Sequence, residues 1–304
     1  MMANVCDADV AVSPGQARQL IESQFPELVL TDLEIIDYGF DNTVMKVNDN
    51  LVFRFPRREI AVRLLETEGK LLPMLAEADL GLQIPVPLYY GKPSSEYEWP
   101  FIGYRFVKGT IPSLARGVMR DRESAIRLAR FLRILHGTNV KKAKGNGVPY
   151  DELSRLSVEK RKATLGKNTN AIKNLNLFHQ VELLENYLQN LPKETLPEDI
   201  TLVHGDLHFK NIVVDQDGIL SGVIDWGDVH LGHRSIDLNL MYSFLYPAAR
   251  ELFLEEYGKV GKTELEYARF KAVYTNAVLL LYGYHEKQPH TVTEAQKCLE
   301  LALT

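Results

Sequence analysis

Two short polar segments in the C-terminal half of the chain limit its fold and chemistry most strongly. They occupy residues 204–211 and 224–228, and the apolar residues between them surround a turn signal at 215–218. This pattern is typical of two short strands joined by a tight turn. Such a hairpin would bring Asn211 and Asp225 side by side at its open end. Amide and carboxylate oxygens are ligands that Mg²⁺ accepts, so a shared metal site is expected there.

The spacing of three polar residues points to phosphoryl transfer. Asp206 lies five residues before Asn211, and Asp225 lies fourteen residues after it. Protein kinases carry a catalytic Asp, a metal-binding Asn and a metal-binding Asp in this order. One carboxylate orients the attacking hydroxyl, while two oxygen ligands hold Mg²⁺ on the phosphates. We therefore predict that Asp206 is catalytic and that Asn211 and Asp225 hold the metal.

These motifs make the chain resemble the aminoglycoside phosphotransferase family, which is related to protein kinases. The similar segments follow the family's order along the chain: 38–43, 52–56, 100–104, 204–207, residue 211 and 224–228. The resemblance implies an α+β, bilobal protein-kinase-like fold. Its N-terminal lobe would hold a five-stranded antiparallel sheet with a helix, and its C-terminal lobe would be larger and mostly helical. It also implies Mg²⁺ and a nucleoside triphosphate donor, either ATP or GTP.

Apolar periodicity divides the chain in the same way. The elements predicted first are a helix at 14–25, strands at 33–38, 43–47 and 51–55, a helix at 59–78, and two strands within 83–106. After residue 122 the spacing favours helices, with a basic loop at 141–147. We expect a nucleotide-binding lobe at 1–104 and a catalytic and acceptor-binding lobe at 105–304.

Arg54 is the candidate cation for the donor phosphates. It lies in an apolar strand where protein kinases have a phosphate-contacting Lys, and a guanidinium suits phosphate well. Glu68 on the following helix is expected to hold it in place. Ordinary surface roles stay open for both residues, and Lys46 on the preceding strand is the alternative cation.

Further donor contacts are expected around the predicted sheet and the catalytic segment. Backbone amides near Asn42 and Thr43 could reach phosphate, although a plain hairpin turn explains them equally well. Backbone groups from Tyr104 to Phe106 would contact the purine. His208 lies where protein kinases place a Lys near the transferred phosphate, but it could also only pack the loop.

Three further residues are expected to have supporting roles. We expect His204 to hydrogen-bond backbone near Asp225 and His136 to be a buried hydrogen-bonding residue at a helix end. The family resemblance implies that Asp237 braces the loop, and a charge partner of a helix N-terminus is the alternative for it. A zinc hydrolase is the alternative for the pair His204 and His208. Zinc sites of this spacing need a helix, whereas the residues before His204 are typical of a strand.

The acceptor is expected in the C-terminal lobe, near Asp228, Glu251, Glu255 and Tyr257. A carboxylate-rich cleft would favour a polycationic aminoglycoside. The acidic residues could equally be the exposed face of a helix, and the neighbouring aromatic residues could line a macrolide site. A sugar or amino alcohol kinase and a pseudokinase scaffold are the remaining alternatives.

Composition excludes several other functions. The chain has 304 residues, of which 45% are hydrophobic. Its net charge of −5 argues against nucleic acid or an anionic membrane as partner. Its two cysteines cannot form a disulfide framework. No leader sequence or transmembrane-length run is evident, so a cytoplasmic protein is expected. The oligomeric state and any role in antibiotic resistance stay open.

Overall fold

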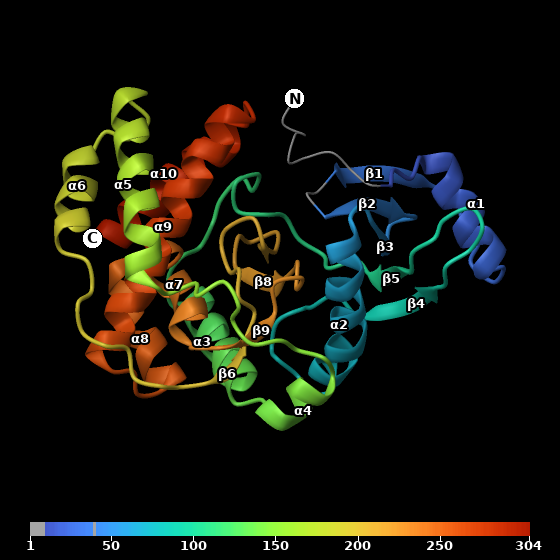
Figure 1. Ribbon diagram of the computed structural model, residues 1–304, viewed down its shortest axis with the longest axis horizontal. Coiled ribbons are helices and arrows are strands. Elements are labelled where there is room, and N and C mark those ends of the chain that lie inside the picture. The colour runs from blue at the N-terminus through green and yellow to red at the C-terminus, as the bar shows by residue number, and fades with distance from the viewer. Residues whose placement is uncertain (1–9, 39–40) are drawn as a thin grey trace. The chain divides into compact units, whose positions relative to one another are not determined.

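The computed structural model describes residues 10–38 and 41–304 (Figure 1). Contacts within the chain gather into two compact units. The first is rich in strands, and the second is mostly helical. None of the helices in the described stretches combines the length and the apolar character that a membrane span requires.

The units do not divide at a single point of the chain. The first consists of the chain up to Ala78 together with Ile84–Val107, and the second consists of Asp79–Gln83 together with Lys108–Thr304. The short segment that ends at Gln83 joins the second unit through backbone hydrogen bonds. Gln83 N donates to Ser221 O, and Val223 N donates to Gln83 O, both at 2.9 Å.

An antiparallel sheet carries the described part of the first unit. In chain order the elements are α1 (Pro14–Gln24), β1 (Leu33–Tyr38), β2 (Asn42–Val47), β3 (Leu51–Pro56), α2 (Glu59–Ala76), β4 (Pro87–Gly91) and β5 (Phe101–Arg105). The five strands lie in the order β1-β2-β3-β5-β4. This is the five-stranded sheet with a long helix that the sequence predicts.

Alternation along β3 separates an apolar face from a polar one. Phe53 and Phe55 are fully buried, and Phe101 on β5 stacks on Phe55 with ring centroids 4.7 Å apart. Since successive side chains of a strand point to opposite faces, Arg54 lies on the other face. The strand therefore fills the core on one side and presents a cation on the other.

Helices dominate the second unit. Its elements are α3 (Arg122–His136), α4 (Val140–Gly145), α5 (Val158–Asn174), α6 (Val181–Gln189), β6 (Thr201–Val203), β7 (Ile212–Val214), β8 (Leu220–Val223), β9 (His230–Gly232), α7 (Ser235–Ser243), α8 (Pro247–Tyr257), α9 (Lys262–His285) and α10 (Pro289–Leu303). Two short antiparallel sheets, β6-β9 and β7-β8, lie among these helices.

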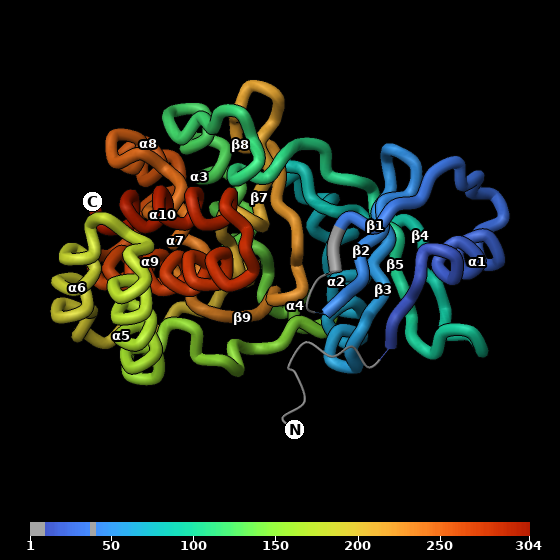
Figure 2. Tube along the Cα trace, turned by 90° about the horizontal axis from the view of Figure 1, so that it is seen from above, coloured from blue at the N-terminus to red at the C-terminus, as the bar shows by residue number. Residues whose placement is uncertain are grey.

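The long helix α9 organises the packing of this unit. It packs against α5, α7 and α10, and Figures 1 and 2 both show α5 and α10 beside it. Phe209, three residues after Asp206, is buried in the same core cluster as Phe270 of α9. The loop that carries the candidate catalytic residue is thus anchored on α9.

Two local elements differ from the sequence prediction. The predicted basic loop at 141–147 contains the short helix α4, which begins after Asn139, whose side chain accepts the N–H of Lys142 at 3.0 Å. The strand β9 is also unpredicted. It pairs with β6 over three residues, which are too few for a recognisable alternation.

Candidate active site

A buried carboxylate fixes the backbone of the loop that follows β6. Asp237, in the first turn of α7, is fully buried. Its Oδ2 accepts the N–H of His204 at 2.7 Å, and its Oδ1 accepts the N–H of Gly205 at 3.0 Å. Asp237 therefore braces the loop that carries Asp206, as the sequence predicts.

His136 connects this carboxylate to α8. Its Nε2 lies 3.2 Å from Asp237 Oδ2, and its Nδ1 lies 2.8 Å from the Tyr257 hydroxyl. Both distances fit the tautomer in which Nε2–H donates to Asp237 and Nδ1 accepts the Tyr257 proton. Burial raises the pKa of Asp237, but the hydrogen bonds from His136 and Gly205 outweigh burial and keep the pKa below its usual range. The predicted role of His136 as a buried hydrogen-bonding residue is confirmed.

The residue before Asp206 must be glycine. Gly205 has a φ of +89°, a left-handed conformation that side chains disfavour. A Cβ added there would lie 2.3 Å from Asp228 O and 2.6 Å from His230 Nδ1. The loop can therefore pass this close to the 228–230 backbone only with glycine at this position.

His204 connects the loop that carries Asp206 to the end of the β7-β8 hairpin. Its Nε2 lies 3.1 Å from Ile224 O, and its Nδ1 lies 3.4 Å from the N–H of Asp206. The fully buried Trp226 packs edge-on against its ring, with centroids 4.8 Å apart. His204 thus hydrogen-bonds backbone next to Asp225, which is the bracing role that the sequence predicts.

The Asp206 carboxylate is held through one of its two oxygens. His208 Nε2 lies 3.2 Å and Asn211 Nδ2 3.3 Å from Asp206 Oδ2, while Asn211 Nδ2 also donates to Asp206 O at 2.9 Å. Within the described part of the chain, no hydrogen bond reaches Oδ1. Burial raises the pKa of Asp206, but the charges of His208 and Lys271 outweigh it and hold the pKa far below its usual range. The site therefore contains an ionised carboxylate with one oxygen available.

The β7-β8 hairpin has the register that its turn predicts. Ile212 pairs with Val223, and the N–H of Ile224 donates to Asn211 O at 2.9 Å, so Asn211 and Asp225 occupy the open end. Asp225 adopts a left-handed φ of 62° and is exposed. The buried Trp226 follows it at once and anchors the turn.

The donor set at this end of the hairpin fits a magnesium ion. Asn211 Nδ2 is engaged by Asp206, whereas no hydrogen bond from the described residues reaches its Oδ1. The exposed carboxylate of Asp225 would supply the second oxygen. Mg²⁺ is commonly held by one or two such protein oxygens, with phosphates and water as the other ligands. The two residues present therefore suit this ion chemically.

In the first unit, Arg54 and Glu68 form a buried ion pair. Arg54 Nη1 lies 2.8 Å and 2.9 Å from the two Glu68 oxygens, and the Tyr104 hydroxyl donates to Glu68 Oε2 at 3.1 Å. Both the Arg54 and the Glu68 side chains are largely buried, and β3 lies inside the sheet. Arg54 is therefore no edge-strand surface residue, and Glu68 fixes its guanidinium.

The remaining predicted donor residues of the first unit have varied environments. Asn42 and Thr43 are buried on β2, and Asn42 Oδ1 has no hydrogen bond among the described residues. Residues 39–40 of the predicted phosphate loop lie outside the described part. The Phe106 N–H donates to a carbonyl of the β2-β3 turn at 2.8 Å, so it is occupied within the unit. Lys46 pairs with the exposed Asp49 at 3.1 Å, which makes it a surface residue.

The structure does not gather the four predicted acceptor residues. Tyr257 is buried, stacks on Phe253 and bonds His136, so it belongs to the core rather than to an open cleft. Glu251 and Glu255 lie on the exposed face of α8. Asp228 is exposed and forms an ion pair with Arg155. These four residues therefore do not form the expected carboxylate-rich cleft.

A zinc site at His204 and His208 finds no support. The described residues contain one cluster with three metal-ligating side chains close together, formed by Asp199, His233 and Glu264. Arg234 Nε lies 2.7 Å from Glu264 Oε1 and 3.3 Å from Asp199 Oδ2, so a guanidinium already pairs with both carboxylates. Neither histidine of the zinc hypothesis belongs to this cluster.

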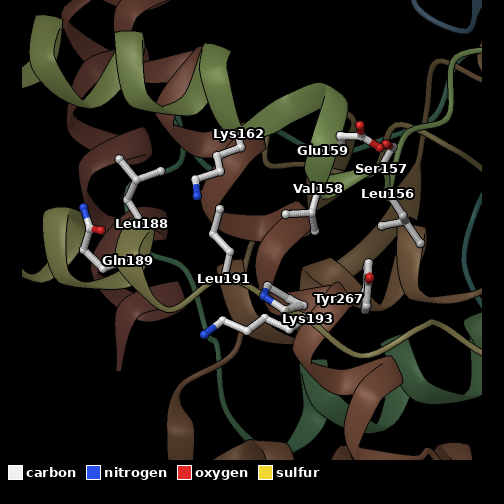
Figure 3. Close-up of a pocket in the computed structure, with 11 residues that line it drawn as sticks. Leu156, Ser157, Val158, Glu159, Lys162, Leu188, Gln189, Leu191, Lys193 and Tyr267 are labelled. Carbon is white, nitrogen blue, oxygen red and sulfur yellow. The ribbon is translucent and has the colours of Figure 1, made fainter.

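A separate surface pocket of about 470 Å³ lies where the start of α5, the end of α6 and α9 meet (Figure 3). Lys162 and Lys193 line it from above and below in this view, with Leu191 between them and Tyr267 to their right. Its lining includes none of the predicted site residues. The pocket therefore carries no argument about phosphoryl transfer.

Sequence reasoning missed two cations, one that acts on Asp206 and one that pairs with Asp228. The charge of Lys271 acts on the Asp206 carboxylate, and Arg155 pairs with Asp228 as well as with Asp151, the latter at 2.9 Å. Lys271 lies between Phe270 and Ala272 in an otherwise apolar stretch of α9. A lone lysine inside a buried run was the signal that could have identified it.

Comparison with known proteins agrees with this arrangement. The model of the phosphotransferase enzyme family (APH) matches residues 32–272. The uncharacterized protein YcbJ of Bacillus subtilis (strain 168) is 24% identical over 258 residues, which is 75% of each chain. The family match alone covers well over half of the chain.

Solved structures show the same fold. The GDP complex of wild-type aminoglycoside 2'-phosphotransferase-IIIa is 24% identical, with a TM-score of 0.68 over 96% of this chain and 99% of that chain. The apoenzyme of the macrolide 2'-phosphotransferase MphH from Brachybacterium faecium is 20% identical, with a TM-score of 0.61 over 94% and 97%. The predicted kinase-like α+β fold is thereby confirmed. The chain belongs to the phosphotransferase enzyme family.

Proposed function

We propose that this protein is a magnesium-dependent kinase that transfers the terminal phosphate of ATP or GTP to a hydroxyl group of a small molecule. The observation that carries the proposal is the Asp206 carboxylate, which is ionised, braced on Oδ2 and available on Oδ1. An acceptor hydroxyl that donates to Oδ1 would be oriented for in-line attack. The family match supports phosphoryl transfer as the reaction class.

The neighbours of Asp206 assist this role by fixing its geometry. His208 and Asn211 share Oδ2, so the carboxylate cannot rotate without losing both contacts. Asp237 holds the backbone on the N-terminal side of Asp206 through His204 and Gly205. Orientation of this kind lowers the barrier because the reacting groups no longer have to find their alignment.

Asn211 Oδ1 and the Asp225 carboxylate would hold Mg²⁺, which neutralises charge on the donor phosphates when it is bound. In the first unit, Arg54 is the proposed phosphate-binding cation. Its bond to Glu68 keeps the guanidinium fixed, and a planar fork suits phosphate oxygens. GDP appears in the name of one solved neighbour complex and ATP in that of another, which supports a nucleotide donor but leaves the choice of base open.

The class of acceptor is less directly supported. The names of two solved neighbours include kanamycin and streptomycin, and a third neighbour is a macrolide 2'-phosphotransferase. Aminoglycosides and macrolides are therefore the first acceptor classes to test. However, a polycation would need several carboxylates around Asp206. Glu251, Glu255 and Tyr257 do not supply such a surface, and Asp228 is already paired with Arg155.

The test is nucleotide consumption with ATP and with GTP, across aminoglycosides, macrolides, sugars, amino alcohols and hydroxy acids. For any acceptor that is turned over, Asp206→Asn should lower kcat by about 10²–10⁴-fold. Asp217→Asn, in the exposed β7-β8 turn, is the matched control and should keep wild-type turnover. Near wild-type activity of Asp206→Asn would refute the assignment.

The metal assignment has its own readout. Asp225→Asn keeps the size of the side chain but removes its charge, so it should raise the Mg²⁺ concentration needed for half-maximal turnover. The same change at Asp217 should leave the Mg²⁺ requirement unaltered. An equal requirement in wild type and Asp225→Asn would contradict the proposed ligand role.

A further inference from the structure

Lys271 is a buried lysine that forms no ion pair within the part of the chain that the structure describes. Its side chain lies on α9 with 8% of the residue exposed. Among the described residues, none forms a hydrogen bond or an ion pair with its ammonium group. Burial of an ammonium group without a partner is costly, and such groups are therefore rare unless a ligand compensates for them.

The surroundings of Lys271 place it near the candidate catalytic carboxylate. Burial lowers its pKa, the charges of Asp206 and Asp228 raise it, and those of Arg155 and Arg161 lower it further. Lys271 therefore shares its environment with Asp206, although the two form no ion pair.

Arg161 of α5 adds a second cation beside α9. Its guanidinium lies over the Tyr274 ring, 5.5 Å from the centroid, and its Nη2 donates to Leu153 O at 2.9 Å. Its Nε is buried and has no hydrogen bond among the described residues. Tyr274 follows Lys271 by three residues, so the two side chains are neighbours on one helix face. Two cations with unused donors thus meet beside Tyr274.

The nearby carboxylates form no ion pair with these two cations in the described part of the chain. Asp151 and Asp228 both pair with Arg155, whose single positive charge offsets one of the two carboxylates. Asp206 acts on Lys271 through its charge, but its hydrogen bonds go to His208 and Asn211 through Oδ2. The ammonium group of Lys271 and the Nε–H of Arg161 therefore stay available to an oxyanion.

We propose that Lys271 and Arg161 bind an oxyanion, a carboxylate or phosphate group, that the acceptor itself carries. The acceptor would then be an anionic hydroxy compound, with its hydroxyl at Asp206 Oδ1 and its anionic group at the two cations. This inference rests on the proposed function and names its substrate class. The same cations would repel a polycationic aminoglycoside. The terminal phosphate of the donor is the other possible source of the oxyanion, and the experiment separates the two.

The first test asks whether Lys271 serves binding or folding. Lys271→Met removes a buried charge and keeps an unbranched side chain, so the melting temperature should stay equal or rise. Lys262→Met, at the exposed start of the same helix, is the matched control. A clear fall of the melting temperature in Lys271→Met alone would assign a structural role to the lysine and overturn the proposal.

The second test identifies the charge class of the acceptor. A deproteinised cell extract is separated by ion exchange into anionic, neutral and cationic small molecules, and each fraction is incubated with Mg²⁺ and γ-labelled ATP or GTP. Kanamycin serves as a defined polycation. We expect label to be transferred in the anionic fraction, with kcat/KM reduced about 10- to 100-fold in Lys271→Met and in Arg161→Gln. Lys262→Met should behave like the wild type.

The other outcomes are distinct. Transfer only in the neutral or cationic fraction, with Lys271→Met as active as the wild type, would overturn this inference and leave the proposed function intact. Weaker binding of Mg-nucleotide to Lys271→Met, measured by calorimetry without acceptor, would assign the oxyanion to the donor. Absence of transfer in every fraction and to kanamycin would contradict the proposed function itself.

Discussion

Replacement of the buried carboxylate of Asp237 by an amide should destabilise the second unit strongly. Asp237→Asn replaces only one carboxylate oxygen by an NH₂ group, but both original oxygens accept backbone N–H groups, from His204 and Gly205. The amide oxygen of Asn can keep one of these bonds. Its NH₂ group then faces the other N–H, which is left buried without an acceptor.

The expected size of the effect follows from these contacts. Loss of a hydrogen bond to a charged group costs about 1.5–3 kcal/mol, and an unsatisfied buried N–H costs about 1–3 kcal/mol more. The bond from His136 Nε2 is also weakened. We therefore expect the free energy of unfolding to fall by about 3–5 kcal/mol, with a fall in kcat because the loop that carries Asp206 loses its brace.

Guanidinium unfolding followed by tryptophan fluorescence would measure this change. The chain has two tryptophans, so a Trp99→Phe background leaves Trp226, which packs on His204, as the only indole reporter. Asp217→Asn in the same background is the control and should change stability by less than about 0.5 kcal/mol. A loss below about 1 kcal/mol in Asp237→Asn would refute the reasoning.

The stability difference between the wild type and Asp237→Asn should depend on pH. Burial raises the pKa of Asp237, but hydrogen bonds from His136 and Gly205 more than offset this, so the folded-state pKa lies below the ordinary 3.8. A depressed pKa contributes stability above the unfolded-state pKa, and the contribution is lost as the pH falls towards the folded-state pKa. The stability difference between the wild type and Asp237→Asn should therefore be constant near neutral pH and shrink below about pH 4. A difference that grows on acidification would contradict this assignment.

Two further substitutions test the loop and the donor cation. Gly205→Ala should lower the melting temperature and reduce kcat at least about tenfold, because the added Cβ would clash with Asp228 O. The control is Gly15→Ala, in open space on α1, which should leave both the melting temperature and kcat unchanged. Unaltered melting of Gly205→Ala would contradict the close approach. Glu68→Gln should weaken Mg-nucleotide binding about tenfold or more in calorimetry, since Arg54 loses its charged partner, and unchanged affinity would argue against Arg54 as a phosphate-binding residue.

Local chemistry explains why the hairpin and its polar ends could be predicted from sequence. The turn at 215–218 and the short apolar runs on either side determine the register, and the register brings Asn211 and Asp225 to one end. The pairing of Arg54 with Glu68 could also be predicted, because strand alternation orients the first side chain and helix periodicity orients the second. In each of these cases the information lies within a few residues.

Long-range packing explains what could not be predicted. Tyr257 is a residue type that often lines ligand clefts. Here α8 packs against α3, and the Tyr257 hydroxyl hydrogen-bonds His136, which is far away in the sequence. Lys271 stands between apolar residues of its helix, but its burial and the action of its charge on Asp206 depend on how α9 packs within the unit. The helix α4 is too short for apolar periodicity, so only its cap at Asn139 marked it.

The most direct measurement is a crystal structure with a nucleotide and Mn²⁺, which replaces Mg²⁺ and can be located by its anomalous scattering. We predict one cation beside the phosphates, within about 2.0–2.3 Å of Asn211 Oδ1 and of an Asp225 oxygen. Asp206 Oδ1 should face the terminal phosphate across the space for an acceptor hydroxyl. A cation bound elsewhere, with neither Asn211 nor Asp225 among its ligands, would rule out the proposed metal site.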